Sequence, residues 1–266
     1  MICFLIPALA WAESEQETAA PSTTLRQNYH RLETGYAVSR IRPADETDKT
    51  TLQNFLISGD VVLTPEASLT ATLPIVALAR QVGLANPSLG FKSVFFEGLL
   101  KGFPTFVFFS GNVKFPLSSD QEFVFQRTDV AIQVSSLREV YHLSLRSDLA
   151  YILKFDSSSA DEKYGNELTT TVGGELNTGY HFSVGLDLNY RYAGGFRSEQ
   201  ERISGRSLFI LRPHFAYSFK PDMLLHGIYA MPVGRAQLRE TLRVFGDYTI
   251  PGVAGDTFLL SFEKRF

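Results

Sequence analysis

Two His-x-Ser triplets are the side chains of this sequence best suited to catalysis. His142 and Ser144 are two positions apart, and so are His181 and Ser183. On a β-strand this spacing puts both side chains on one face, where an imidazole can act as general base for a serine hydroxyl. The surrounding segments are rich in His, Ser and Asn, so chance explains both pairs more simply. We therefore expect no enzymatic activity.

Metal and cofactor chemistry has weaker support. The five histidines are spread over separate segments and never form a close pair: His30, His142, His181, His214 and His226. The single cysteine, Cys3, falls in the predicted signal segment discussed below, so neither a disulfide framework nor a cysteine metal site is expected. A net charge of −3 gives no basic face for nucleic acid. We predict no metal, no cofactor and no nucleic-acid partner.

The N-terminal residues resemble a processing segment more than a structural one. An apolar run from Ile2 to Leu9 precedes Ala10-Trp11-Ala12, which fits the cleavage site of a secretory signal. The usual basic residues before the run are missing, which predicts a true start further upstream. We expect a signal peptide over residues 1–12 and a flexible periplasmic lead-in over 13–30. A buried N-terminal strand is the alternative for the apolar run.

From residue 31 onward the apolar residues repeat with a period of two. Between His181 and Tyr192 six apolar side chains alternate with six small or polar ones, which a strand sorts onto two faces and a helix would scatter. Charged residues and prolines keep every apolar run below the roughly 18 residues of a spanning helix. The pattern predicts about twelve strands: 31–41, 51–63, 68–78, 88–96, 105–117, 128–136, 141–153, 166–176, 181–192, 209–219, 224–233 and 257–266.

The connections between these segments differ by parity. Those after even-numbered strands are mostly short, and those after odd-numbered strands are longer and more polar: 42–50, 79–87, 118–127, 157–165, 195–205 and 235–255. Short turns at one rim and long loops at the other are typical of outer-membrane barrels. We therefore predict an all-β fold, a single transmembrane antiparallel β-barrel over residues 31–266. We expect it in the bacterial outer membrane.

The polar face of the strands then lines the lumen. Aromatic residues near strand ends, such as Tyr192 and Phe219, fit interfacial girdles, so the apolar face should meet lipid. The predicted lumen-lining residues carry both signs of charge: Lys92, Lys114, Asp129, Arg146, Asp148, Lys154, Glu175, Asp187, Arg191 and Arg212. They line a narrow wet passage or pair across the interior and fill it. The unusually apolar loop 235–255 either folds into the mouth as a constriction or packs outside.

The last ten residues, TFLLSFEKRF, resemble the C-terminal strand of outer-membrane proteins. Phe258, Leu260, Phe262 and Phe266 match its alternating apolar positions and terminal aromatic residue. Lys264 departs from the pattern, but a lysine near the periplasmic interface can extend its ammonium toward water. The resemblance implies insertion into outer-membrane lipid by the barrel-assembly machinery, which would recognise this strand.

Three internal segments are similar to the transporter family named for the meta-pathway of phenol degradation. They are Ala71-Thr72-Leu73-Pro74-Ile75-Val76, the stretch from Val82 to Lys92, and Val113-Lys114-Phe115-Pro116-Leu117. Ala85-Asn86 replaces the Gly-Asp of that family, and Leu117-Ser118-Ser119-Asp120 replaces its Thr-Gly-Asp. The resemblance implies passage of small hydrophobic or aromatic molecules across the outer membrane.

The His-x-Ser spacing is also similar to outer-membrane phospholipase, whose neighbouring strand adds an asparagine. No asparagine follows His142 at the distance found in that family, and the pairs fall on the face assigned to the lumen. We thus expect a passive channel for small hydrophobic or aromatic solutes, the solute itself being unknown. A non-transporting structural or adhesive barrel is the alternative, and a lipid hydrolase is a distant third.

Overall fold

The structure, a computed structural model, describes most of the chain from His30 onward. The described residues are 30–41, 50–78, 81–116, 127–156, 162–179, 181–199, 201–233, 243–247 and 249–266. The predicted signal peptide (1–12) and all of the predicted lead-in (13–30) except His30 lie outside them.

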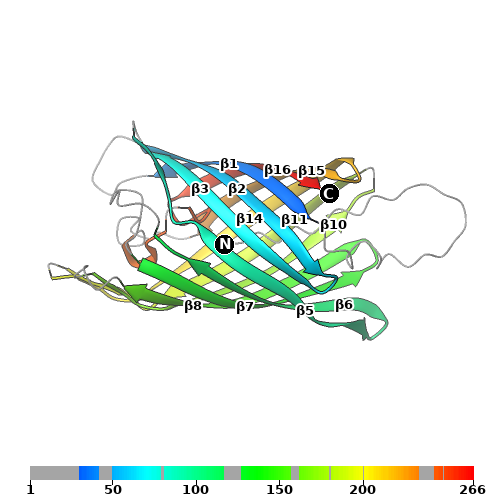
Figure 1. The fold of residues 1–266 in the computed structure, drawn as a ribbon, viewed down its shortest axis with the longest axis horizontal. Helices are drawn as coiled ribbons and strands as arrows, with labels where there is room; N and C mark the ends of the chain where they lie inside the picture. Colours follow the sequence, from blue (N-terminus) through cyan, green and yellow to red (C-terminus); the bar gives the residue numbers. More distant parts are fainter. Residues whose placement is uncertain are drawn as a thin grey trace, which may run out of the picture.

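Within the described residues, twelve long antiparallel strands close into one barrel (Figure 1). The all-β prediction is therefore confirmed. The barrel closes because β1 pairs with both β2 and β16, and Arg31 lies opposite Arg265 in that last pairing. In barrel order the strands are β1 (Arg31–Ile41), β2 (Thr50–Thr64), β3 (Ala67–Leu78), β5 (Ser88–Leu100), β6 (Phe103–Lys114), β7 (Arg127–Val140), β8 (Leu143–Asp156), β10 (Glu167–Asn177), β11 (Phe182–Ala193), β14 (Arg206–Lys220), β15 (Met223–Val233) and β16 (Asp256–Arg265).

Two predicted strands begin slightly too early. Tyr141 and His181 lie in turns rather than in β8 and β11, with φ of 55° and 63°. These positive angles belong to the left-handed region, which tight hairpin turns require and extended strands exclude. Alternation of side-chain types could not reveal this boundary, because both residues continue the polar and apolar series of the strand that follows.

Short elements occupy parts of the connections that were predicted to be loops. β4 (Gln81–Leu84) adds to the edge of β3, and β9 (Lys163–Tyr164), β12 (Phe196–Arg197) and β13 (Arg202–Ile203) form a small separate sheet. Residues 243–245 make a single helical turn before β16. These elements follow β3, β8, β11 and β15, which are the third, seventh, ninth and eleventh strands of the barrel. They therefore lie at the end of the barrel opposite the tight turns. We call it the loop end, and the opposite end, where β1 begins and β16 finishes, the turn end.

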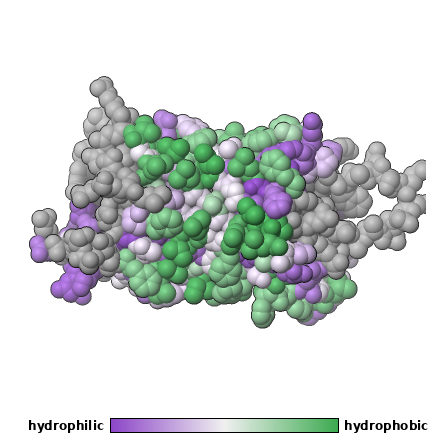
Figure 2. All heavy atoms as spheres, viewed as in Figure 1, coloured by the Kyte–Doolittle hydropathy of each residue, from purple (hydrophilic) through white to green (hydrophobic). Residues whose placement is uncertain are grey.

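The outer wall of the barrel is apolar. Leu186 and Leu188 of β11 are about half exposed, at 50% and 47%, although exposure of such apolar side chains to water is unfavourable. Hydrophobic side chains gather over the middle of the wall on the face that Figure 2 shows, and hydrophilic ones lie mainly toward its two ends. Among the described residues, no helix is both long and apolar enough to cross a bilayer.

Candidate functional site

The interior of the barrel is largely polar. Every second residue of each strand points inward, and these residues are mostly the polar members of the alternating sequence. All ten residues predicted to line the lumen lie on barrel strands, and their recorded ion pairs join them to one another or to other inward side chains. Lys92 extends over the ring of Phe108, with its Nζ 4.1 Å from the ring centroid. The charges are thus gathered into networks rather than spread evenly along a bore.

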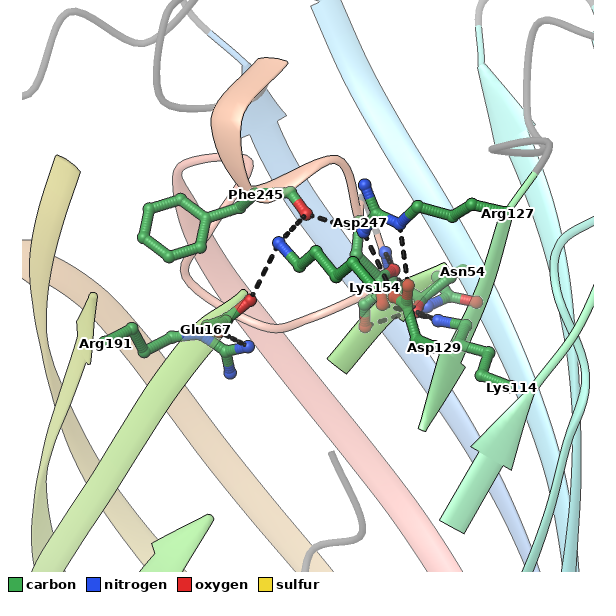
Figure 3. A network of polar contacts seen from close by, with 10 residues as sticks. Asn54, Lys114, Arg127, Asp129, Lys154, Glu167, Arg191, Phe245 and Asp247 are labelled. Carbon is green, nitrogen blue, oxygen red and sulfur yellow. Dashed lines mark hydrogen bonds and ion pairs between the residues drawn. The ribbon is translucent and has the colours of Figure 1, made fainter. Parts of the chain in front are cut away.

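One network lies toward the loop end (Figure 3). Glu167 of β10 is 1% exposed and receives two cations, Lys154 at 3.2 Å and Arg191 of β11. On β7, the neighbour of the strand that carries Lys154, Arg127 pairs with Asp129 at 2.7 Å. Each of these buried cations thus has a carboxylate partner. Loss of that partner would be strongly destabilising, because it would leave a buried charge uncompensated.

A segment of the last long loop enters this network. We call residues 243–247 and 249–255 the plug segment. Val244 and Phe245 are fully buried and pack with inward-facing Leu208, Ile210 and Ala230 of the wall. The remaining members of this cluster are Ala193, Phe196, Ile203, Ile250 and Val253. The structure therefore places the described part of loop 235–255 inside the mouth of the barrel.

Polar contacts fix the plug segment to the wall. The carbonyl oxygen of Phe245 accepts hydrogen bonds from Arg127 at 2.9 Å and from Lys154 at 3.2 Å. The carboxylate of Asp247 binds Nζ of Lys114 at 2.5 Å and the hydroxyl of Thr249 at 2.6 Å (Figure 3). Burial alone would raise the pKa of Asp247, but Lys114 and these hydrogen bonds outweigh it and hold that pKa below its ordinary value.

A second network crosses β8, β10, β11 and β14 nearer the turn end. Arg146 of β8 reaches Asp187 of β11 at 2.7 Å, although β10 lies between the two strands. The intervening residue in register is Gly173. A Cβ on Gly173 would come within 1.9 Å of the Asp187 carboxylate, so only glycine leaves room for this ion pair.

Gly185 has the same function one strand further on. It lies in register between Glu175 and His214, which approach each other to 3.6 Å across it. A Cβ on Gly185 would meet Nε2 of His214 at 2.2 Å. Gly173 and Gly185 thus give space to ion pairs between the strands on either side of them.

A third network lies on β1, β2, β15 and β16. Arg31 binds Asp60 at 2.7 Å and Glu263 at 3.3 Å, and Arg265 binds the same Glu263 at 2.7 Å. The fully buried imidazole of His226 lies 3.8 Å from that carboxylate. This cluster was not predicted, although Arg31, Asp60 and Glu263 occupy the inward parity of their strands and could have been found by it.

Between these networks lies a chamber of about 210 Å³. The side of the chamber formed by β7, β8, β10, β11 and β14 carries charged residues, among them Arg127, Asp148 and Arg212. The side formed by β2, β3 and β16 carries an apolar patch of Leu56, Pro74 and Leu259. Polar residues of the same side lie beside this patch: Ser58, Thr70 and Ser261, and Arg31 and Glu33 of the intervening β1. Phe245, Asp247, Thr249, Ile250 and Pro251 of the plug segment complete the lining. The chamber is thus amphipathic.

The terminal strand presents its predicted face outward. Phe258, Leu260 and Phe266 are exposed and Phe262 is half-buried. Lys264, which departs from the usual pattern, pairs with Asp222 in the turn between β14 and β15. Its ammonium therefore reaches the polar rim at the turn end.

Each His-x-Ser pair is divided between a turn and a strand. His142 and His181 lie exposed in turns, whereas Ser144 is half-buried on β8 and Ser183 is buried on β11. Among the residues that the structure describes, no cluster of three or more His, Cys, Asp or Glu side chains could hold a metal ion. The chamber and its plug segment are accordingly the candidate site.

Comparison with known proteins gives a likeness of fold alone. No protein-family model matches the chain, and no curated protein matches it in sequence. The NanC porin structure is 7% identical, with a TM-score of 0.52, over 89% of this chain and all (100%) of that one. The TodX monoaromatic hydrocarbon channel (deltaS2 mutant) is 10% identical over 91% and 92% of the two chains, at a TM-score of 0.44. An active-site mutant of outer membrane phospholipase A from Escherichia coli is 9% identical over 94% and 95%, at a TM-score of 0.45.

The closed barrel and its exposed apolar wall decide the location. In hydrocarbon every backbone polar group must pair, which a closed barrel achieves, and an apolar wall of this extent would not be stable in water. This protein is a β-barrel of the bacterial outer membrane.

Proposed function

We propose that the protein is a narrow outer-membrane channel through which a small solute passes by diffusion, with the plug segment as its constriction. The observation that supports this most is the chamber of about 210 Å³, lined by polar groups and covered at the loop end by residues 243–247 and 249–251. Small barrels fill their interior with side chains, and wide ones leave an open pore. A chamber behind a plug that is held by side-chain contacts rather than by pairing of strands fits a passage that opens.

The solute class follows from two lines of support. The family resemblance of residues 71–76, 82–92 and 113–117 implies hydrophobic or aromatic molecules. The chamber adds an apolar side, at Leu56, Pro74 and Leu259, on which such a body can pack. We propose a small molecule with an aromatic or other apolar body as the solute.

A specific observation favours a second function, that of a non-transporting structural barrel. The networks around Glu167, Asp187 and Glu263 join neighbouring and next-but-one strands along the inner surface of the wall. A barrel held closed by such pairs would serve surface structure or adhesion. The expectation that the protein is not an enzyme stays a prediction.

Planar-bilayer recordings of the purified protein distinguish these functions. A channel gives discrete openings, and deletion of residues 243–249 raises the single-channel conductance by roughly twofold or more because the constriction is removed. A variant that keeps the chain length, Phe245→Ser combined with Asp247→Asn, checks that the change comes from lost plug contacts. Absence of openings in all three proteins, each migrating as a folded barrel, overturns the channel and supports the structural function.

A further inference from the structure

The wall around the plug segment carries more positive than negative charge. In the ion pairs of the described side chains there, Lys114, Arg127, Lys154 and Arg191 share two wall carboxylates, Asp129 and Glu167, and the Asp247 carboxylate of the plug segment. If the plug segment left the mouth, these four cations would share two of these carboxylates instead of three. Such an excess in a restricted space attracts anions.

The plug segment itself shows how an anion is held at this place. The Asp247 carboxylate receives Nζ of Lys114 at 2.5 Å, the hydroxyl of Thr249 at 2.6 Å and the amide of Thr249 at 2.9 Å. The Phe245 carbonyl oxygen lies between Arg127 and Lys154. Three cations from β6, β7 and β8 thus converge on oxygen acceptors that the chain supplies. A solute carboxylate offers the same acceptors in a charged form, which binds more strongly than a neutral carbonyl.

The opposite side of the chamber determines the rest of the ligand. In barrel order β16 lies across from β7, and β2 and β3 belong to the part of the wall between β16 and β6. Leu259 therefore lies on the strand opposite that of Arg127, and Leu56 and Pro74 continue the apolar lining along the wall toward β6. A molecule that spans the chamber places its charged group near the cations and its apolar body against these side chains.

We propose that Lys114, Arg127 and Lys154 form a carboxylate-binding site, which the acceptors of the plug segment fill and which a small monocarboxylic acid with an apolar body takes over. This inference rests on the proposed channel function, for which it names the solute class. The incoming carboxylate replaces Asp247 at Lys114 and the Phe245 carbonyl at Arg127 and Lys154. Binding of the solute and release of the plug segment are then the same event.

Calorimetric titration of the detergent-solubilised protein tests the site independently of transport. The probes are benzoate, neutral benzyl alcohol and cationic benzylamine, which share one ring. We expect benzoate alone to bind measurably. Asp247→Asn tightens benzoate binding about tenfold by removing the internal competitor, and Lys114→Gln weakens it by about tenfold or more. Lys114→Arg keeps the charge and retains binding, while Lys264→Gln, on the outer rim, leaves the affinity unchanged.

Uptake of the same three probes into liposomes separates the inference from the channel function. Equal binding of benzoate and benzyl alcohol, or an unchanged benzoate affinity in Asp247→Asn, overturns the carboxylate site. Uptake without preference for benzoate overturns it as well and leaves the channel standing. Binding of benzoate without uptake of any probe supports the site and overturns the channel. Loss of uptake in Lys114→Gln, with Lys114→Arg active, supports both.

Discussion

At the scale of single residues, the interior depends on where side chains are missing. Arg146 and Asp187 meet across β10 because Gly173 has no Cβ, and Glu175 meets His214 across β11 because Gly185 has none. In each pair the two partners lie on strands that are separated by a third strand, so their side chains must pass over that strand to meet. Glycine, which usually weakens a strand, is here required by the pairing of its neighbours.

The adjacent glycines of β10 provide a matched test of this role. Gly173→Ala places a Cβ 1.9 Å from the Asp187 carboxylate, whereas a Cβ at outward-facing Gly174 meets nothing closer than 3.5 Å. We expect Gly173→Ala to lower the free energy of unfolding by about 1–3 kcal/mol, because Asp187 must leave Arg146. Gly174→Ala should be neutral or stabilise by up to about 1 kcal/mol through reduced freedom of the unfolded chain. Urea unfolding in lipid vesicles measures both, and equal effects would contradict the spacing role.

At the scale of elements, the plug segment differs from the strands in how it is held. Strands are fixed by continuous backbone ladders, but residues 243–247 rely on an apolar cluster around Phe245 and on a few polar contacts. An element of this kind belongs to the less stable part of a structure, from which moving parts are drawn. Its release therefore depends on few groups. Asp247 is the charged group that contacts the wall inside the mouth, whereas the ion pair of Arg243 with Glu201 is exposed.

The pH response of the plug segment follows from Asp247. Its pKa lies below the ordinary value, so the contact with Lys114 persists above the unfolded pKa, about 4, and is lost only as pH falls through the lower folded value. We predict that wild-type conductance is unchanged between about pH 7 and about pH 5. Asp247→Asn removes the charge and should raise the open fraction already at neutral pH.

Single-channel recording checks both statements, with Glu201→Gln as the control. Glu201 pairs with Arg243 at an exposed position of the same rim, and such pairs contribute little. Opening of the wild type on mild acidification would contradict the role assigned to Asp247, as would an Asp247→Asn variant that opens no more often than the control.

The sequence predicts the strands much better than the contacts between them. Alternation identified all twelve barrel strands, because a half-buried strand must sort its side chains with a period of two. Parity also predicted inward charges such as Arg146 and Lys154, and by the same rule it could have added Glu167 and Glu263. It could not predict Asp247, because loop residues have no parity and their partners depend on tertiary structure. The positive φ of Tyr141 and His181 was likewise invisible, since turns use the same residue types.

At the scale of the whole molecule, the apolar and polar faces are reversed relative to a protein in water. Many large apolar side chains are exposed, for example Leu188 and Phe219, whereas Arg191 and Glu167 are almost completely buried. Only a hydrocarbon surrounding makes this arrangement favourable. The depth of a residue along the wall should then decide how much a charge costs there.

Two outward substitutions test this orientation. Leu188 lies near the middle of β11 and Phe219 near the turn end of β14, and both side chains face outward with 47% and 55% exposure. Leu188→Arg should lower the free energy of unfolding in vesicles by about 2–4 kcal/mol, because the guanidinium meets the hydrocarbon midplane. Phe219→Arg should cost about 1 kcal/mol or less, because its guanidinium reaches the head groups. If both cost the same, the apolar wall does not face a bilayer, and a channel across the outer membrane would have lost its physical basis.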